Sequence, residues 1–193
     1  MDLLDVIRSR RSIGRLSPPA PSAEQLGQIL DAAACAPDHG SLRPWRFIVL
    51  RDDAKDAFGP VLAAATEAEY RDKGLEPEPA KLKKDLTKME RAPLIVVVAC
   101  QYQPNEKIPR SEQHDAVVAA AQNAILASTA LGFGSMWRTG PNAYNPHVKR
   151  ALGLGEGCDI VGFLYIGTVA DGRSKPPNEP DLDGVVTHWQ PPA

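Results

Sequence analysis

The sequence has little of what secreted proteins and metal proteins depend on. Its three cysteines, Cys35, Cys100 and Cys158, are odd in number and far apart, and none belongs to a C-x-x-C pair. This spacing argues against a disulfide framework and against a thiolate zinc site. The four histidines show no metal-ligand spacing either. We therefore expect no metal, and a cytoplasmic location.

Long apolar runs and an excess of basic charge are also missing. The longest strongly apolar run, PLIVVVAC at residues 93–100, is too short to span a bilayer and is typical of a buried strand. The N-terminus lacks the basic start and unbroken apolar stretch of a signal peptide. The formal net charge is -2, which gives no general attraction to nucleic acid or anionic lipid. We expect a soluble protein with no nucleic-acid and no membrane partner.

Two common nucleotide and hydrolase motifs are absent. The glycine-rich stretches LGFGSMW at residues 131–137 and GLGEGCD at residues 153–159 both lack the third glycine of the dinucleotide-binding fingerprint. The first of them also follows a predicted helix and enters a predicted strand, which reverses the order that the fingerprint needs. No G-x-S-x-G elbow supplies a hydrolase nucleophile.

The composition is that of one globular domain. Apolar residues make up 43% and charged residues 24% of the 193 residues, close to the average for folded proteins. The length suits a single hydrophobic core. We therefore expect residues 1–193 to form one domain.

Helical and strand patterns are spread along the chain, and capping signals mark several helix ends. The first predicted helix covers residues 2–9, and the second begins at the capping box of Ser22 and Gln25 and stops before Pro37. Two helical segments are predicted within residues 52–91, with a break at residues 74–79. The last two predicted helices are residues 111–131 and a helix that starts at Asn145 and Pro146. The predicted strands are residues 46–51, 93–100, 132–139 and 159–169.

Residues 170–193 are rich in proline, aspartate and glycine. A frayed end is the common interpretation of such a tail. The apolar residues Val185, Val186 and Trp189 instead favour an arm that packs on a partner subunit. The residues alone leave both interpretations open.

Arginine, hydroxyl and aromatic groups recur at the ends of the predicted elements. They lie in RSRRS at residues 8–12, in APDHGSLRPW at residues 36–45 and in WRTG at residues 137–140. Arginine binds phosphate in a bidentate manner and hydroxyl groups add further donors, so one phosphorylated ligand could use all three stretches. Arginines at a helix C-terminus also simply favour the helix dipole, which is the better interpretation for Arg8.

Four segments, taken in order, carry a family resemblance. The stretches at residues 8–50, 91–100 (RAPLIVVVAC), 132–140 (GFGSMWRTG) and 160–168 (IVGFLYIGT) resemble the nitroreductase family of FMN-dependent oxidoreductases, and its short bacterial branch in particular. The resemblance implies an α+β fold in which a mixed β-sheet is flanked by helices. It also implies an intertwined homodimer with two FMN molecules at the subunit interface.

The resemblance further implies which residues hold the cofactors. Those assigned to FMN on one subunit are Arg10, Arg11, Ser12, Trp137, Arg138 and Thr139, with the first three at the phosphate and ribityl group. Those assigned to the flavin of the other subunit are His39, the backbone around Cys35, and Ser41. The stretch associated with NAD(P)H is Ala127, Ser128, Thr129, Ala130, Leu131 and Gly132.

One departure concerns the phosphate. Larger members of the family place a basic pair near the C-terminus, whereas this chain has no lysine or arginine after Lys175. Arg138 would then carry more of the phosphate charge.

The implied function is hydride transfer from NAD(P)H to nitroaromatic, quinone or related small electron acceptors by a ping-pong mechanism, with FMN carrying the chemistry. Arg10 or Arg11 would stabilise reduced flavin electrostatically. A second hypothesis is a flavin-binding or flavin-delivering protein without a dedicated acceptor. Flavin cleavage or dehalogenation is a third, for which the helical region 54–90 is the candidate lid.

Overall fold

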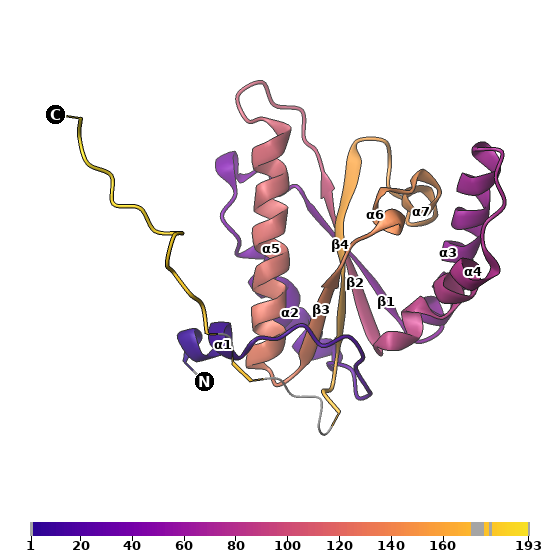
Figure 1. The fold of residues 1–193 in the computed structure, drawn as a ribbon, viewed down its shortest axis with the longest axis horizontal. Coiled ribbons are helices and arrows are strands. Elements are labelled where there is room, and N and C mark those ends of the chain that lie inside the picture. The colour runs from indigo at the N-terminus through magenta and orange to yellow at the C-terminus, as the bar shows by residue number, and fades with distance from the viewer. Residues whose placement is uncertain (1, 171–175, 178, 193) are drawn as a thin grey trace.

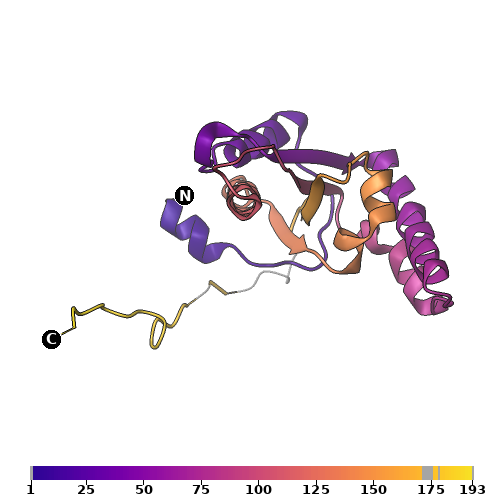
Figure 2. The same cartoon turned by 90° about the horizontal axis from the view of Figure 1, so that it is seen from above.

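A four-stranded sheet forms the centre of the molecule and separates two layers of helices (Figure 1, Figure 2). The strands are β1 (Trp45–Arg51), β2 (Leu94–Gln101), β3 (Gly134–Arg138) and β4 (Cys158–Gly167), in the order β1-β2-β4-β3. The computed structural model describes residues 2–170, 176–177 and 179–192.

The helices divide between the two faces of the sheet. The helices α2 (Ala23–Ala34) and α5 (Arg110–Ala130) cover one face, and α1 (Leu3–Ser9) packs on α5. The other side carries α3 (Asp52–Asp72), α4 (Pro79–Leu86), α6 (Pro141–Tyr144) and α7 (Pro146–Ala151). Two 3-10 turns, η1 (His39–Ser41) and η2 (Lys88–Arg91), complete the described elements.

β2 is apolar at nearly every position because both of its faces are buried. Side chains alternate between the two faces of a strand. Val96 and Val98 therefore pack with α2 and α5, while Ile95 and Val97 pack with α3. This double burial accounts for the uninterrupted run of apolar residues.

Side-chain caps begin three of the helices. Asp2 accepts a hydrogen bond from the backbone N–H of Leu4 at 3.1 Å at the start of α1. Ser22 and Gln25 form the predicted capping box of α2, with distances of 2.9 and 3.2 Å. Asn145 caps α7, whose first residue is a proline. Such caps satisfy backbone N–H groups that have no partner inside the helix.

The α+β class is confirmed, and most predicted elements agree with the observed ones to within about two residues at each end, the margin within which assignments of helix ends themselves differ. The second helical segment predicted within residues 52–91 is the exception, because α4 ends at Leu86 and the 3-10 turn η2 occupies residues 88–91. The single turn α6 was not predicted, because four residues are too few to show a helical period. None of the described helices is both long and apolar enough to cross a bilayer.

The expectation of a mixed sheet is wrong for the described residues, because every pair of neighbouring strands is antiparallel. The single parallel contact is an isolated bridge between Ser12 and Ser135 at the edge of β3. This bridge does not lengthen into a strand pair, because the chain turns away from β3 at Gly14. The carbonyl of Gly14 accepts its hydrogen bond from the guanidinium of Arg138 and not from the backbone of β3.

The C-terminal tail extends away from the rest of the protomer (Figure 1, Figure 2). Its large apolar side chains are exposed, and Trp189 reaches 79% exposure. Lys175 lies outside the described residues. The protomer alone therefore leaves the choice between a frayed end and an arm on a partner open.

Gly59 lets α4 lie close against α3. A Cβ atom at this position would overlap the backbone carbonyl oxygen of Leu86, the last residue of α4. A backbone atom cannot rotate out of the way, so any larger residue must push the two helices apart.

We predict that Gly59→Ala lowers the free energy of unfolding by about 1–3 kcal/mol. Gly27→Ala in α2 is the matched control, because beyond its chain neighbours and its own helix backbone its Cβ would meet no atom within 4 Å. Alanine is the better helix former, so this control should gain about 0.5–1 kcal/mol. Urea unfolding at one protein concentration compares the two, and a Gly59→Ala protein as stable as wild type would contradict the close approach.

Candidate functional site

A cavity of about 350 Å³ opens between the end of β3 and α4. Small-molecule sites in proteins commonly have this size. Its walls combine an apolar floor with polar residues from several elements. The lining residues are Leu62, Lys84, Lys88, Met89, Met136, Trp137, Arg138, Thr139, Gly140, Pro141, Asn142, Phe163 and Tyr165.

Positive charge dominates this cavity. Lys84, Lys88 and Arg138 line it, and among the residues that the structure describes no carboxylate does. The chain as a whole carries a formal charge of -2. The positive lining is therefore a local feature that favours an anionic ligand.

Arg138 ends β3 on the cavity side of the sheet. Its guanidinium carbon lies 5.4 Å from the centre of the Tyr165 ring, and Nη2 donates to the carbonyl of Gly14 at 3.3 Å. Burial, and then the charge of nearby Arg91, lower the pKa of Arg138, although an arginine stays charged at any physiological pH.

Two buried side-chain atoms of β3, Nε of Arg138 at its end and Oγ of Ser135 near its start, have no hydrogen-bond partner in the protein. Leaving such a group unsatisfied costs about 1–3 kcal/mol, so each one needs an explanation. A ligand that accepts a hydrogen bond from Arg138 is the simplest explanation for its Nε.

A buried carboxylate, Asp85, organises the α4 side of the cavity. Nζ of Lys88 lies 2.6 Å from its Oδ1, and the Thr66 hydroxyl donates to Oδ2 at 2.8 Å. The Asn142 amide donates to Oδ1 at 3.4 Å. Burial raises the pKa of Asp85, but the hydrogen bonds from Lys88 and Thr66 outweigh it, so the pKa lies below its ordinary value. The ionised Asp85 thus holds two cavity residues, Lys88 and Asn142.

The structure brings two of the predicted groups together. Residues 10–12 run beside β3, where Ser12 pairs with Ser135 and leads on to Gly14 at the guanidinium of Arg138. Residues 137–139 end the same strand, with Thr139 exposed beyond it. Trp137 packs on the other face of the sheet, where its indole N–H donates to the carbonyl of Val161 at 3.2 Å.

Arg11 also meets the stretch associated with NAD(P)H. A smaller cavity of about 210 Å³ is lined by Arg11, Thr129 and Gly132, among others. Within that stretch the side chain of Ser128 faces the core, where its hydroxyl donates to the carbonyl of Ala124 at 2.8 Å. Leu131 is half-buried at the end of α5.

The loop after α2 carries the third predicted group in a constrained backbone. Nδ1 of His39 lies 2.6 Å from Oε2 of Glu112, in the first turn of α5. Ser41 and Arg43 have φ values of 54° and 50°, a left-handed conformation that residues with a side chain rarely adopt. Such strain gathers at functional sites. Cys35 is exposed at the C-terminal end of α2.

The predicted groups lie near opposite ends of α5. His39 contacts Glu112 at the start of the helix, and Arg11 shares a cavity with Thr129 near its end. At about 1.5 Å per residue the two helix positions are about 25 Å apart. Within one protomer, therefore, one small ligand cannot contact both His39 and Arg11.

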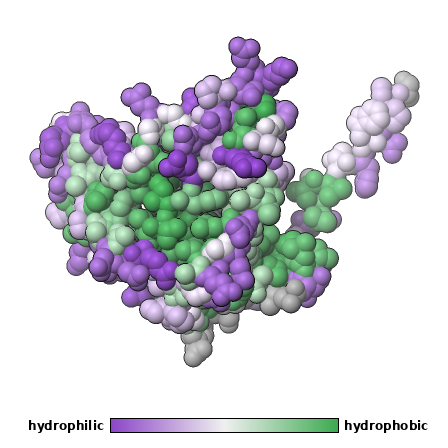
Figure 3. All heavy atoms as spheres, turned by 180° about the vertical axis from the view of Figure 1, so that it is seen from behind, coloured by the Kyte–Doolittle hydropathy of each residue, from purple (hydrophilic) through white to green (hydrophobic). Residues whose placement is uncertain are grey.

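An apolar groove of about 540 Å³ lies between α1, α2 and α5. Leu3, Cys35, Leu126 and Ala130 are among its lining residues. In α1, Leu3 is 64% exposed. Seen from behind, the molecule carries a further apolar area across the middle of its surface, where β1 lies (Figure 3). Contiguous apolar surface of this kind marks sites of association.

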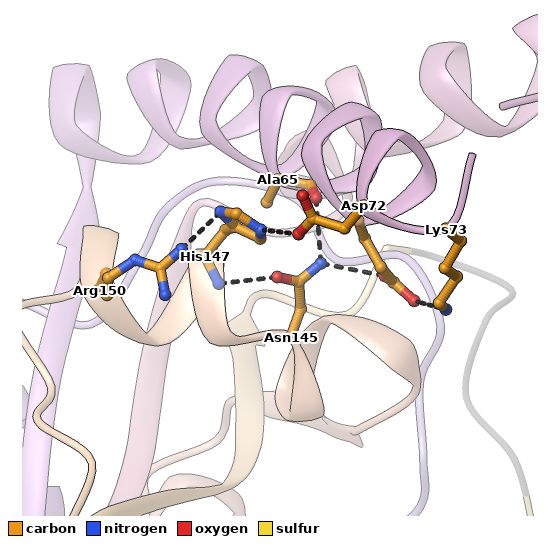
Figure 4. Close-up of polar contacts among 7 residues, drawn as sticks. Ala65, Asp72, Lys73, Asn145, His147 and Arg150 are labelled. Atoms are coloured by element: carbon orange, nitrogen blue, oxygen red, sulfur yellow. Dashed lines mark hydrogen bonds and ion pairs between the residues drawn. The ribbon is translucent and has the colours of Figure 1, made fainter. Parts of the chain in front are cut away.

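A second polar cluster joins α3 to α7 (Figure 4). Nε2 of His147 lies 3.1 Å from Asp72, and Arg150 lies 2.6 Å from Nδ1. The Asn145 amide donates to the carbonyl of Ala65 and to Glu69, at 3.1 Å each. These contacts position α7 and the adjoining α6. Across the described part of the chain, no group of three or more His, Cys, Asp or Glu side chains could hold a metal ion.

The sequence predictions missed most of the cavity lining, including its polar residues Lys84, Lys88 and Asn142. In KLKKDLTK at residues 81–88 the lysines look like the solvated face of a helix. The spacing of Lys84 and Lys88 was the available signal, because residues four apart lie on one side of a helix.

Comparison with known proteins assigns the fold to a family. A model of the nitroreductase family matches residues 7–168. The Escherichia coli (strain K12) protein YdjA, which is named as an NAD(P)H nitroreductase, is 39% identical over 190 residues, which cover 98% of this chain and 100% of YdjA.

Two solved structures share the fold over nearly their whole length. The nitroreductase-like family protein from Bacillus cereus has a TM-score of 0.80 at 25% identity, covering 99% of this chain and 97% of that one. A Desulfovibrio desulfuricans protein, described as a nitroreductase in complex with FMN, has a TM-score of 0.74 at 26% identity, covering 100% of this chain and 99% of that one.

The buried Asp85 gives a prediction about pH. The ordinary pKa of an aspartate is 3.8, and the folded protein lowers it. A lowered folded-state pKa means that the charge stabilises the protein above about pH 4, and that this stabilisation is lost as the pH falls through the folded-state pKa. Asp85→Asn should therefore cost about 1–3 kcal/mol at pH 7, because it removes a charge-assisted acceptor.

The difference between Asp85→Asn and wild type should shrink as the pH falls below about 4. Urea unfolding at several pH values measures it. Glu90→Gln, at an exposed carboxylate in η2, is the control and should stay within about 0.5 kcal/mol of wild type. A constant difference between Asp85→Asn and wild type at all pH values would show that the Asp85 charge does not contribute.

Proposed function

This chain belongs to the nitroreductase family, and on that premise we propose that it is an FMN-dependent oxidoreductase that transfers a hydride from NAD(P)H to nitroaromatic, quinone or related small acceptors. The observation that carries the proposal is the cavity at the end of β3, where a cationic wall includes the buried, unpartnered Nε of Arg138. Support for the redox partners comes from the name of YdjA and from the FMN complex of the Desulfovibrio protein.

The residues present fit FMN. Arg138 supplies a guanidinium for the phosphate, and residues 10–12, with two further arginines and a hydroxyl, run along β3 and lead on to Gly14 at that guanidinium. Phosphate prefers this combination of donors. Met136 and Phe163 give the cavity an apolar floor against which a flat ring can pack. The cationic side chain of Arg138 would compensate for the missing basic pair near the C-terminus.

Bound FMN would supply the hydride chemistry. In each cycle NAD(P)H is oxidised to NAD(P)⁺ and the acceptor gains two electrons, so that with one proton from solvent a quinone becomes a hydroquinone. The nucleotide and the acceptor use the same cavity in turn. Arg138 contributes fixed positive charge, which favours the electron-rich reduced state of a ligand beside it. No side-chain acid or base is needed for the transfer itself.

We propose further that two subunits build each site. His39 and Arg11 lie at positions along α5 that are about 25 Å apart, Glu112 and Thr129, so a ligand that uses both must take one from each subunit. A two-fold axis achieves this, because whenever one residue contacts a different residue of the partner subunit, the reciprocal contact also forms. The apolar groove between α1, α2 and α5 is the surface that a second copy would cover. Since Nδ1 of His39 is engaged by Glu112, Nε2 is the ring atom that would reach the ligand.

The C-terminal tail is the second element proposed for the interface. Its apolar residues, Val185 and Trp189 among them, are exposed in the isolated protomer. Packing on the partner subunit would remove this surface from water, at about 25 cal/mol per Å² buried. The tail is therefore proposed to be an arm rather than a frayed end.

The test begins with protein purified without added flavin. We expect a yellow dimer whose flavin absorbance bleaches on anaerobic addition of NADH or NADPH. A colourless protein that takes up no FMN would contradict the proposal. Bound flavin that stays oxidised with both nucleotides would instead favour a flavin-binding or flavin-delivering role.

Arg138→Gln should weaken FMN binding by about tenfold or more, because it removes a charged donor to the phosphate. Arg8→Gln is the matched control, since Arg8 is an exposed arginine in α1 only two residues before Arg10, and it should bind FMN as wild type does. Titration of the apoprotein with FMN, followed by flavin fluorescence, measures both. Equal affinities for the two variants would remove Arg138 from the site.

A further inference from the structure

Two lysines four residues apart, Lys84 in α4 and Lys88 in η2, approach the cavity with different surroundings. Lys88 is paired with the buried Asp85 at 2.6 Å, so its position is fixed and its charge is largely compensated. Lys84 lines the same cavity from α4, is exposed, and has no hydrogen bond or ion pair in the described part of the chain. Its charge is therefore available to a ligand.

The charge of Lys84 is separate from that proposed for the cofactor phosphate. The phosphate is proposed to lie at Arg138 and residues 10–12, beside β3. Lys84 enters from α4, which packs on α3 on the outer side of the molecule (Figure 1). A ligand lying on the flavin would therefore meet a cation on the α4 side in addition to the phosphate-binding cations.

The rest of the α4 side suits a flat apolar ring. Met89 and Leu62 are buried next to the cavity, and Met136 forms part of its floor. Thioether side chains contact aromatic rings favourably. No carboxylate among the described lining residues would repel an anion. The walls thus combine an apolar surface with one uncompensated, flexible ammonium group.

We infer that this enzyme prefers electron acceptors that carry a negative charge, and that Lys84 binds the carboxylate of an aromatic acid lying in the cavity. The inference rests on the proposed function and deepens it by naming the substrate class. Lys84 is a specificity-determining residue, because it contacts a substituent of the acceptor and not the reacting atoms. An exposed ion pair of this kind changes affinity by about two- to fivefold and is weakened by salt.

The first experiment measures binding without turnover. Oxidised holoenzyme is titrated with benzoate and with benzyl alcohol, a neutral analogue of similar size, and the change in flavin absorbance gives each dissociation constant. Benzoate should bind about two- to fivefold more tightly at low ionic strength, and the difference should shrink at high salt. Equal binding of the two ligands by wild type would overturn the inference.

The variants assign this preference to one residue. Lys84→Gln should abolish the preference for benzoate, and Lys84→Arg should retain it. Lys83→Gln is the matched control, because Lys83 is the adjacent exposed lysine of α4 and does not line the cavity. A preference that survives in Lys84→Gln, or that is lost in Lys83→Gln, would contradict the assignment.

Turnover gives a second readout with 4-nitrobenzoate and neutral 4-nitrobenzyl alcohol as acceptors. Lys84→Gln should lower kcat/KM for the acid by about two- to fivefold and leave that for the alcohol unchanged. Two results would place Lys84 elsewhere and overturn the inference. One is weaker binding of FMN by Lys84→Gln. The other is slower reduction of its flavin by NADPH with unchanged reduction by NADH, which would indicate that Lys84 contacts the additional phosphate of NADPH.

Failure of the proposed function looks different from failure of this inference. If the protein holds no flavin, or if nucleotides do not reduce it, then the proposed function fails. If flavin binds and is reduced normally but charge makes no difference to the acceptor, only the assignment of Lys84 fails.

Discussion

The length of α5 is the constraint on which the arrangement of the site depends. This buried helix spans one face of the sheet and contacts α1 and α2, so its two ends cannot approach each other. The residues predicted to bind one cofactor are divided between those ends, at Glu112 and at Thr129. A helix of this length therefore favours a site shared between two subunits over a site within one.

The other side of the sheet depends on a single buried charge. Asp85 links α3, α4, η2 and α6 through Thr66, Lys88 and Asn142. A buried carboxylate is tolerated only when donors surround it, and here those donors include two residues that line the cavity. The close approach of α4 to α3 at Gly59 brings Asp85 within hydrogen-bond distance of Thr66. Packing and electrostatics together thus position Lys88, while Lys84, four residues earlier in α4, keeps its charge for a ligand.

Much of the fold could be predicted from local patterns. Capping residues such as Ser22 and Asn145 marked helix starts, and the apolar run of β2 marked a strand buried on both faces. The direction of strand pairing could not be predicted, because parallel and antiparallel neighbours present similar apolar patterns. The motifs around Arg11 and Arg138 indicated a phosphate ligand. Asn142 gave no signal, and the four-residue spacing of Lys84 and Lys88 indicated a shared side of the chain but no ligand, because only tertiary packing brings these residues to the cavity.

Subunit complementation tests the shared site most directly. His39→Ala and Arg138→Gln are each expected to impair flavin-dependent activity, and each leaves the other half of the site intact. After subunit exchange, about half of the dimers are mixed and each of these has one intact site, so about a quarter of wild-type activity should return. Mixed dimers that form but recover no activity, or a fully active His39→Ala protein, would contradict a site built from two subunits.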